Sequence, residues 1–161
     1  MIVSSGPQVA PRGLPSSVAR VTAGPPVTGT FFILGEVAKE FPHVVRSIAD
    51  AGHEIASHGY THSRVDRLGR ERFRSELRQS IDVLQHVGGK RVLGYRAPSW
   101  SVGEETPWIY DELAGAGLRY DASVMPFKTY LYGFPHAPRT AHTTPPGVLE
   151  FPATTYPILG K

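Results

Sequence analysis

Two histidines in the segment 57–62 have the residue type and spacing for metal chemistry. His58 and His62 stand four residues apart, so both can face one side of a turn, and neutral imidazole is the commonest metal ligand in proteins. The pair follows a predicted strand, and sites in parallel α/β folds lie beyond the carboxyl ends of strands. The spacing alone leaves two interpretations open, a metal site or two ordinary surface histidines.

A second cluster, Arg96–Trp100, also follows a predicted strand. Arg96 can hold a carboxylate through two hydrogen bonds and fix its orientation. Pro98 makes a rigid turn, which leaves neighbouring backbone N–H groups free to face a ligand. Trp100 is either a packing group or a wall of a sugar site. The alternative interpretation of the whole segment is a surface turn with an aromatic anchor.

Asp121 is the third candidate, because the segment Tyr120–Ser123 again stands at a predicted strand end. Its carboxylate can support a ligand or a catalytic group, whereas the alternative is a turn or cap aspartate. The remaining histidines have no comparable partners and are interpreted as surface or core residues; they are His43, His53, His86, His136 and His142.

The elements that must position these residues alternate between strand and helix. The clearest helix is predicted over 70–87, where Phe73, Leu77, Ile81 and Leu84 form one apolar stripe. Strands are predicted over 30–34, 53–56, 91–95, 118–120 and 148–151, and further helices over 37–51, with a break near Pro42, and from 106 to 115 or 117. This alternation predicts a parallel α/β sheet or a barrel segment.

Composition sets the limits on domain organisation and partners. With 161 residues the chain suits one domain, whereas a complete (β/α)8 barrel takes about 250. Residues 1–28 are rich in proline, glycine and serine and are predicted to be a flexible leader, which leaves 29–161 as the domain. The Pro-rich and aromatic stretch after Asp121 is predicted to be a long functional loop.

The charge and hydropathy of the chain argue against several partners. A net charge of +3 with scattered basic residues does not indicate a nucleic-acid partner. The absence of cysteine excludes a thiolate metal site. No apolar run approaches the ~20 residues of a membrane span. No secretory signal is recognisable at the N-terminus, so the cytoplasm is the default expectation for localisation.

Four segments occur together in the order seen in one family. These segments, 30–35, 51–62, 94–100 and 120–123, resemble NodB-type polysaccharide deacetylases, and most of all the branch found with bacterial exopolysaccharide clusters. The resemblance implies a partial, distorted (β/α)7 barrel. It also implies a hydrolase that uses a divalent metal, usually zinc, to remove acetyl groups from an N-acetylated polysaccharide or oligosaccharide.

The resemblance also implies roles for single residues. His58 and His62 match the histidine metal ligands, and Arg96 matches the arginine that orients a catalytic aspartate. The backbone N–H of Ser99, next to Trp100, falls where the family supplies an oxyanion donor. Asp121 falls near the acidic motif that supports the site, although the usual Trp of that motif is absent.

Two parts of the family pattern are not found in this sequence. The aspartate pair that supplies a base and a third metal ligand has no match, because the first aspartate is Asp50. The late histidine also has no match before Lys161. We therefore expect a domain truncated at both ends that binds metal weakly and deacetylates poorly. Two alternatives remain, an inactive remnant or carbohydrate-binding module of the same fold, and a hydrolase of another linear or cyclic amide.

Overall fold

The structure is a computed structural model that describes residues 27–155. The predicted leader, residues 1–28, falls almost wholly outside the described residues, so the domain boundary after residue 28 stays a prediction. Between residues 27 and 155 there is no helix with both the length and the apolar character needed to cross a membrane.

The described strands form one sheet of six strands in the order β1-β2-β3-β4-β6-β5. All neighbouring pairs from β1 to β6 are parallel, and β5 alone runs antiparallel, against β6. The strands are β1 (Thr30–Ile33), β2 (Glu54–Ser57), β3 (Gly94–Tyr95), β4 (Tyr120–Asp121), β5 (His142–Thr143) and β6 (Leu149–Glu150). The predicted parallel arrangement is therefore confirmed, although most strands are shorter than predicted.

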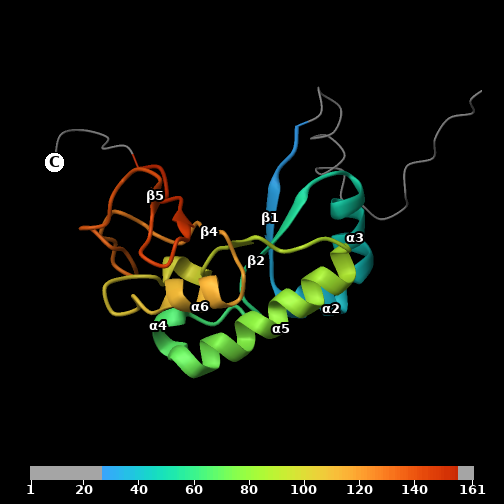
Figure 1. The fold of residues 1–161 in the computed structure, drawn as a ribbon, viewed down its shortest axis with the longest axis horizontal. Helices are drawn as coiled ribbons and strands as arrows, with labels where there is room; N and C mark the ends of the chain where they lie inside the picture. The colour runs from blue at the N-terminus through green and yellow to red at the C-terminus, as the bar shows by residue number, and fades with distance from the viewer. Residues whose placement is uncertain (1–26, 156–161) are drawn as a thin grey trace, which may run out of the picture.

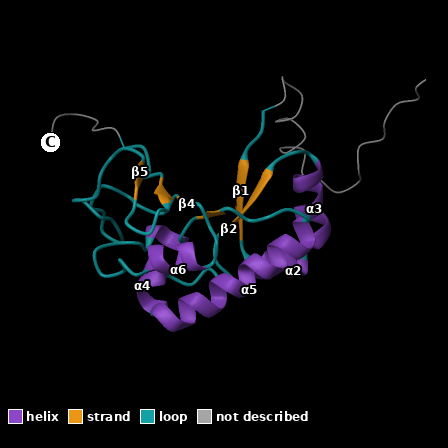
Figure 2. Cartoon of the chain, viewed as in Figure 1, coloured by secondary structure: helices purple, strands orange, loops and turns teal. Residues whose placement is uncertain are grey.

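The helices lie on one side of these strands (Figure 1; Figure 2). They are α2 (Gly35–Glu40), α3 (Pro42–Asp50), α4 (Val65–Leu68), α5 (Arg70–Gly88) and α6 (Ile109–Gly115), with a 3₁₀ turn η1 (Pro98–Trp100). The predicted break near Pro42 separates α2 from α3, because proline at the first helical position supplies no N–H to continue the preceding helix. Helix α5 packs against α2, α3 and β2.

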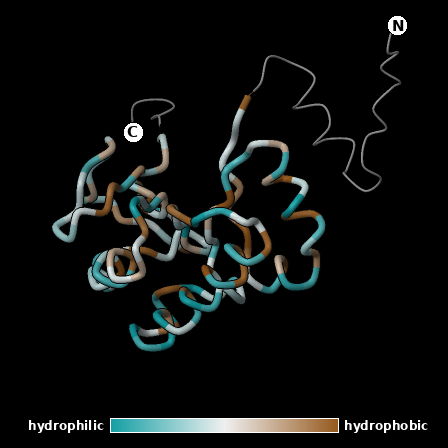
Figure 3. The backbone as a smooth tube through the Cα atoms, turned by 45° about the vertical axis from the view of Figure 1, so that its right-hand side comes forward, coloured by the Kyte–Doolittle hydropathy of each residue, from teal (hydrophilic) through white to brown (hydrophobic). Residues whose placement is uncertain are grey.

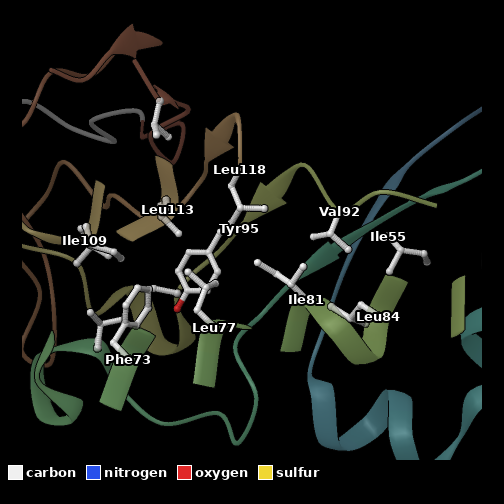
Figure 4. Close-up of a cluster of buried hydrophobic side chains, with 14 of the residues drawn as sticks. Ile55, Phe73, Leu77, Ile81, Leu84, Val92, Tyr95, Ile109, Leu113 and Leu118 are labelled. Carbon is white, nitrogen blue, oxygen red and sulfur yellow. The ribbon is translucent and has the colours of Figure 1, made fainter. Parts of the chain in front are cut away.

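The apolar stripe of α5 forms much of the core (Figure 4). Phe73, Leu77, Ile81 and Leu84 are all buried, as their spacing predicted. The ring of Phe73 meets that of Tyr95 edge-on, with 5.6 Å between centroids. Figure 3 shows hydrophobic and hydrophilic positions alternating along the helices, as expected for elements that bury one face.

The predicted start of α6 is wrong by two residues. The pair Thr106-Pro107 has the residue types of an N-cap and a first helical position, but α6 begins at Ile109. The Thr106 hydroxyl instead accepts a hydrogen bond from the N–H of Gly103, at 3.0 Å, and donates to the Gly103 carbonyl. This local bonding closes a separate turn before the helix. The predicted end is confirmed, because Gly117 has a positive φ of 78° just after α6.

Candidate active site

Strand register brings the three candidate segments to one edge of the sheet. Ser57 pairs with Tyr95, and Tyr95 pairs with Asp121, so the ends of β2, β3 and β4 are level. The backbone N–H of Arg96 then donates to the Ser57 carbonyl at 2.9 Å, and that of Ala122 donates to the Tyr95 carbonyl at 3.0 Å. The predicted clustering beyond the carboxyl ends of the strands is therefore present.

The two histidines face each other after β2. Their ring centroids are 5.1 Å apart with an interplanar angle of 65°. Nδ1 of His58 lies 2.8 Å from the carbonyl oxygen of Arg96. Because a carbonyl only accepts hydrogen bonds, Nδ1 must carry the proton, and Nε2 keeps a lone pair for a ligand. Burial lowers the pKa of His58, so the imidazole is neutral at pH 7.

A braced turn returns the chain from His58 to His62. Gly59 has a φ of 84°, its N–H donates to the Ser57 hydroxyl at 3.1 Å, and its carbonyl accepts from the hydroxyl of Ser80 on α5 at 3.0 Å. His62 itself is exposed and has a φ of 62°, an uncommon conformation for a residue with a side chain. This left-handed residue lets the second ring lie beside the first.

The described residues do not complete a catalytic zinc site. Between residues 27 and 155, no group of three or more histidine, aspartate and glutamate side chains is arranged to hold a metal ion. The fixed Nε2 of His58 and the ring of His62 suit a metal, but catalytic zinc sites use three protein ligands. The predicted metal dependence therefore stays a prediction.

Arg96 is held by aromatic rings and a backbone carbonyl. Its guanidinium carbon lies 4.3 Å from the centroid of the Phe32 ring and 5.5 Å from that of Trp100. Its Nε donates to the carbonyl of Ala122 at 3.0 Å. None of the ion pairs within residues 27–155 involves Arg96. The predicted carboxylate partner is thus not among the described residues.

The turn after Arg96 has an unusual backbone. Ser99 and Trp100 have φ values of 54° and 50°, both in the left-handed region, which costs on the order of 1–3 kcal/mol for a residue that is not glycine. The hydroxyl of Ser101 donates to the Pro98 carbonyl at 2.6 Å and accepts from the N–H of Val65 at 3.0 Å. These bonds anchor the strained turn to the start of α4.

Asp121 supports this turn indirectly and makes no ion pair with Arg96. Its Oδ1 accepts hydrogen bonds from the N–H of Ala122, at 2.9 Å, and from the hydroxyl of Ser123. The same hydroxyl accepts from the N–H of Ala97 at 2.8 Å. The side chain of Asp121 therefore fixes Ser123, and Ser123 fixes the residue that follows Arg96. Asp121 is a positioning residue in this arrangement.

Glu150 is a functional candidate that the sequence reasoning missed. It pairs with Asp121 in the β4–β6 register, and both carboxyl groups are fully buried. Oε1 of Glu150 accepts from the N–H of Val124 at 3.0 Å, whereas the buried Oδ2 of Asp121 has no hydrogen-bond partner among the described residues. Burial and the neighbouring Glu150 raise the pKa of Asp121 well above its usual value, so this carboxyl group keeps its proton to a higher pH than an exposed aspartate does. In the sequence, the feature that could have indicated Glu150 is an acidic residue within the otherwise apolar strand predicted over 148–151.

Comparison with known proteins identifies the family. A sequence model described as polysaccharide deacetylase matches residues 11–119. The chain belongs to this family. The match begins inside the segment predicted to be a leader and includes His58, His62 and Arg96, whereas Asp121 lies just beyond it.

Two curated relatives of this deacetylase family member have names that refer to peptidoglycan. A peptidoglycan deacetylase-like protein of Gibberella zeae is 33% identical over 110 residues, which cover 66% of this chain and 32% of the relative. A peptidoglycan-N-acetylglucosamine deacetylase of Bacillus cereus is 26% identical over 136 residues, covering 77% and 49%. The chain therefore spans about a third to a half of the length of these relatives.

Solved structures confirm the fold predicted from the sequence. A protein of Mycobacterium smegmatis assigned to the polysaccharide deacetylases has a TM-score of 0.65 and 34% identity, covering 80% of this chain and 41% of that one. An allantoinase, 24% identical, shares the fold with a TM-score of 0.60, covering 80% and 39%. A family 4 carbohydrate esterase pseudoenzyme from Bacillus anthracis has a TM-score of 0.53 and 25% identity, covering 57% and 32%. The described sheet and helices are part of a (β/α) barrel.

Proposed function

We propose that the protein is a hydrolase that removes acetyl groups from N-acetylated sugars of a glycan. The observation that supports this most is the imidazole of His58, whose Nδ1 is held at 2.8 Å by the carbonyl of Arg96, three residues before the left-handed Ser99. The names of the peptidoglycan and chitooligosaccharide deacetylases among the relatives support an acetamido sugar as substrate. An exopolysaccharide is the polymer that the sequence resemblance favours.

The residues of this chain have separate roles in the proposed reaction, in which water and an amide give acetate and an amine. Negative charge develops on the acetyl oxygen, and the backbone N–H of Ser99 is the proposed donor to it. Arg96, between Phe32 and Trp100, presents its Nη groups to a carboxylate or to the substrate. The unprotonated Nε2 of His58 is the proposed metal ligand.

A divalent metal, with zinc as the expected ion, would lower the pKa of bound water and polarise the acetyl carbonyl. His58 and His62 supply two of the three protein ligands that such a site uses, and residues 27–155 offer no third. We therefore propose that this chain binds zinc weakly and releases acetate slowly.

The second candidate function is an inactive carbohydrate-binding member of the same fold. Two observations favour it, the two-histidine ligand set and the likeness to the Bacillus anthracis pseudoenzyme. The remaining alternative is a hydrolase of another linear or cyclic amide. Only a shared fold supports it, because the allantoinase is no more than 24% identical to this chain.

Acetate release from N-acetylglucosamine tetramers separates these candidates. We expect slow release in the presence of excess zinc, and a fall of about a hundredfold in the variant His58→Ala. His86→Ala is the matched control, because His86 is exposed on α5, and it should leave the rate unchanged. No release from the wild type, together with measurable tetramer binding, would support the inactive binding protein instead.

A further inference from the structure

The second histidine of the candidate site lies at the far end of its turn. The first two backbone N–H groups of α2 donate to the carbonyls of Gly59 and Tyr60, at 3.0 and 3.2 Å. These bonds stop two residues before His62. His62 is exposed, and its φ of 62° is a conformation that a residue with a side chain keeps only where the surrounding structure imposes it. A contact beyond Tyr60 must therefore hold His62.

Side-chain hydrogen bonds hold the residues on either side of His62. The hydroxyl of Thr61 donates to Oε2 of Glu76 at 2.9 Å, and it lies 2.7 Å from the hydroxyl of Ser63. Because Thr61 has one hydroxyl proton and a carboxylate only accepts, that proton goes to Glu76, and Ser63 must donate to Thr61. Within residues 27–155, no other hydrogen bond reaches positions 61–63. Glu76 is therefore the anchor for this end of the turn.

The core packing of α5 fixes the position of Glu76. Its neighbours Phe73 and Leu77 are buried in the core, and its own side chain is only 12% exposed. Its Oε1 accepts from Nε of Arg72 at 3.3 Å, but Arg72 is 69% exposed, so this ion pair contributes little. The other oxygen, Oε2, is the one that accepts from Thr61. A rigid helix thus presents a fixed acceptor to the turn.

We propose that Glu76 is a positioning residue for the second histidine. By holding the hydroxyl of Thr61, it keeps His62 in its left-handed conformation, so that the imidazole lies beside that of His58. The inference rests on the proposed function, because the paired rings are taken to be metal ligands. Glu76 is not itself a ligand and acts only through the turn. Its removal therefore releases His62, whereas His58 stays fixed by the carbonyl of Arg96.

Nuclear magnetic resonance of the full 161-residue chain without metal measures the placement of the two rings. The ring protons of His58 and His62 should show a nuclear Overhauser effect, because the ring centroids are 5.1 Å apart. We expect Glu76→Ala to lose this effect, because Thr61 then has no acceptor. Alanine preserves the helix. Thr61→Val breaks the same bond without any change in α5 and should give the same result.

Calorimetric titration of the same variants with zinc measures the consequence for binding. We expect the Kd for zinc to rise about tenfold in Glu76→Ala and in Thr61→Val, as it does when other residues that orient a metal ligand are removed. Glu76→Gln should bind zinc like the wild type, because the amide oxygen still accepts from Thr61. Glu71→Ala is the matched control, since Glu71 stands on the same helix, is 85% exposed and pairs with Arg74. It should change neither the ring placement nor the affinity.

A ring-to-ring effect that persists in Glu76→Ala, or a zinc affinity that this variant leaves unchanged, would overturn the proposal. An equal loss of affinity in Glu76→Gln would overturn it as well, because the charge and not the hydrogen bond would then be responsible. Acetate release measured in parallel separates this inference from the proposed function. Loss of the ring-to-ring effect in Glu76→Ala, with no acetate release by the wild type, supports the positioning role and contradicts the hydrolase. Acetate release by the wild type, with ring placement independent of Glu76, contradicts the positioning role alone.

Discussion

The carbonyl oxygen of Arg96 determines how His58 is presented, because it accepts from Nδ1 at 2.8 Å and leaves Nε2 free. The spacing of His58 and His62 predicted that both rings lie near each other, and the 5.1 Å separation confirms it. The tautomer was not predictable, because it depends on a carbonyl 38 residues further along the chain. Sequence patterns show which side chains are present, whereas their protonation depends on contacts made only in the fold.

The buried pair of Asp121 and Glu150 gives stability a pH dependence of known sign. Burial and Glu150 raise the pKa of Asp121 above its usual value, so the folded chain keeps a proton that the unfolded chain loses near pH 4. The stability from this proton is full below that pH and is lost as pH rises towards the raised pKa. The amide of Asp121→Asn mimics the protonated acid and does not ionise. The free energy of unfolding of this variant should therefore rise relative to that of the wild type as the pH is raised from about 4 to about 8.

Urea unfolding at pH 4, 6 and 8 measures this effect. Asp82→Asn is the control, because Asp82 is exposed on α5, and its difference from the wild type should not change with pH. A constant difference between Asp121→Asn and the wild type across this range would contradict the raised pKa of Asp121.

At the scale of elements, helices were predicted better than strands. The predicted end of α5 differs from the observed one by one residue. This helix was predictable because four apolar positions repeat along one buried face, Phe73, Leu77, Ile81 and Leu84. Strands β3, β4 and β6 have two residues each, and so short a strand shows no period. β5 was not predicted at all, since it depends on pairing with β6 rather than on its own sequence.

A buried carboxylate on α6 forms ion pairs with two arginines on α5, and no sequence pattern indicates these pairs. Glu112 accepts from Nε of Arg70 and from Nε of Arg74, each at 2.6 Å. These two bonds, with that from Arg74 the stronger cause, lower the pKa of Glu112 to about 2. Arg70 and Arg74 stand on the helix predicted over 70–87 and lie off its apolar stripe. Their partner lies about 40 residues away, so local pattern could not reveal it.

Glu112→Gln should lower the free energy of unfolding by about 2 kcal/mol at pH 7, because a charge-assisted pair is replaced by neutral hydrogen bonds. The contribution of Glu112 is present above its unfolded pKa near 4.5 and is lost as pH falls towards 2. The gap between variant and wild type should therefore shrink from pH 5 to pH 2 in urea unfolding. Glu71→Gln serves as control, since Glu71 pairs with Arg74 from an 85% exposed position and should change stability little. A gap of constant size would contradict the pairing.

At the scale of the whole molecule, the parallel sheet positions a site at the carboxyl ends of its strands. The order β1-β2-β3-β4 places His58, Arg96 and Asp121 at the carboxyl ends of the neighbouring strands β2, β3 and β4, which explains why segments far apart in sequence form one site. The fold and this clustering were predictable from strand ends and from the family resemblance. The bond from Thr61 to Glu76 was not, because its two residues lie 15 positions apart, in a turn and a helix that show no shared pattern.

The central claim is that His58 and His62 form an incomplete metal site in a deacetylase fold. Calorimetric titration of the chain with zinc tests it most directly. Two imidazole ligands predict weak binding, with a Kd of about 1 µM or higher, and no measurable binding in His58→Ala. Tight 1:1 binding, with a Kd of about 10 nM or lower that is abolished by His58→Ala, would contradict the account, because it would require a third protein ligand.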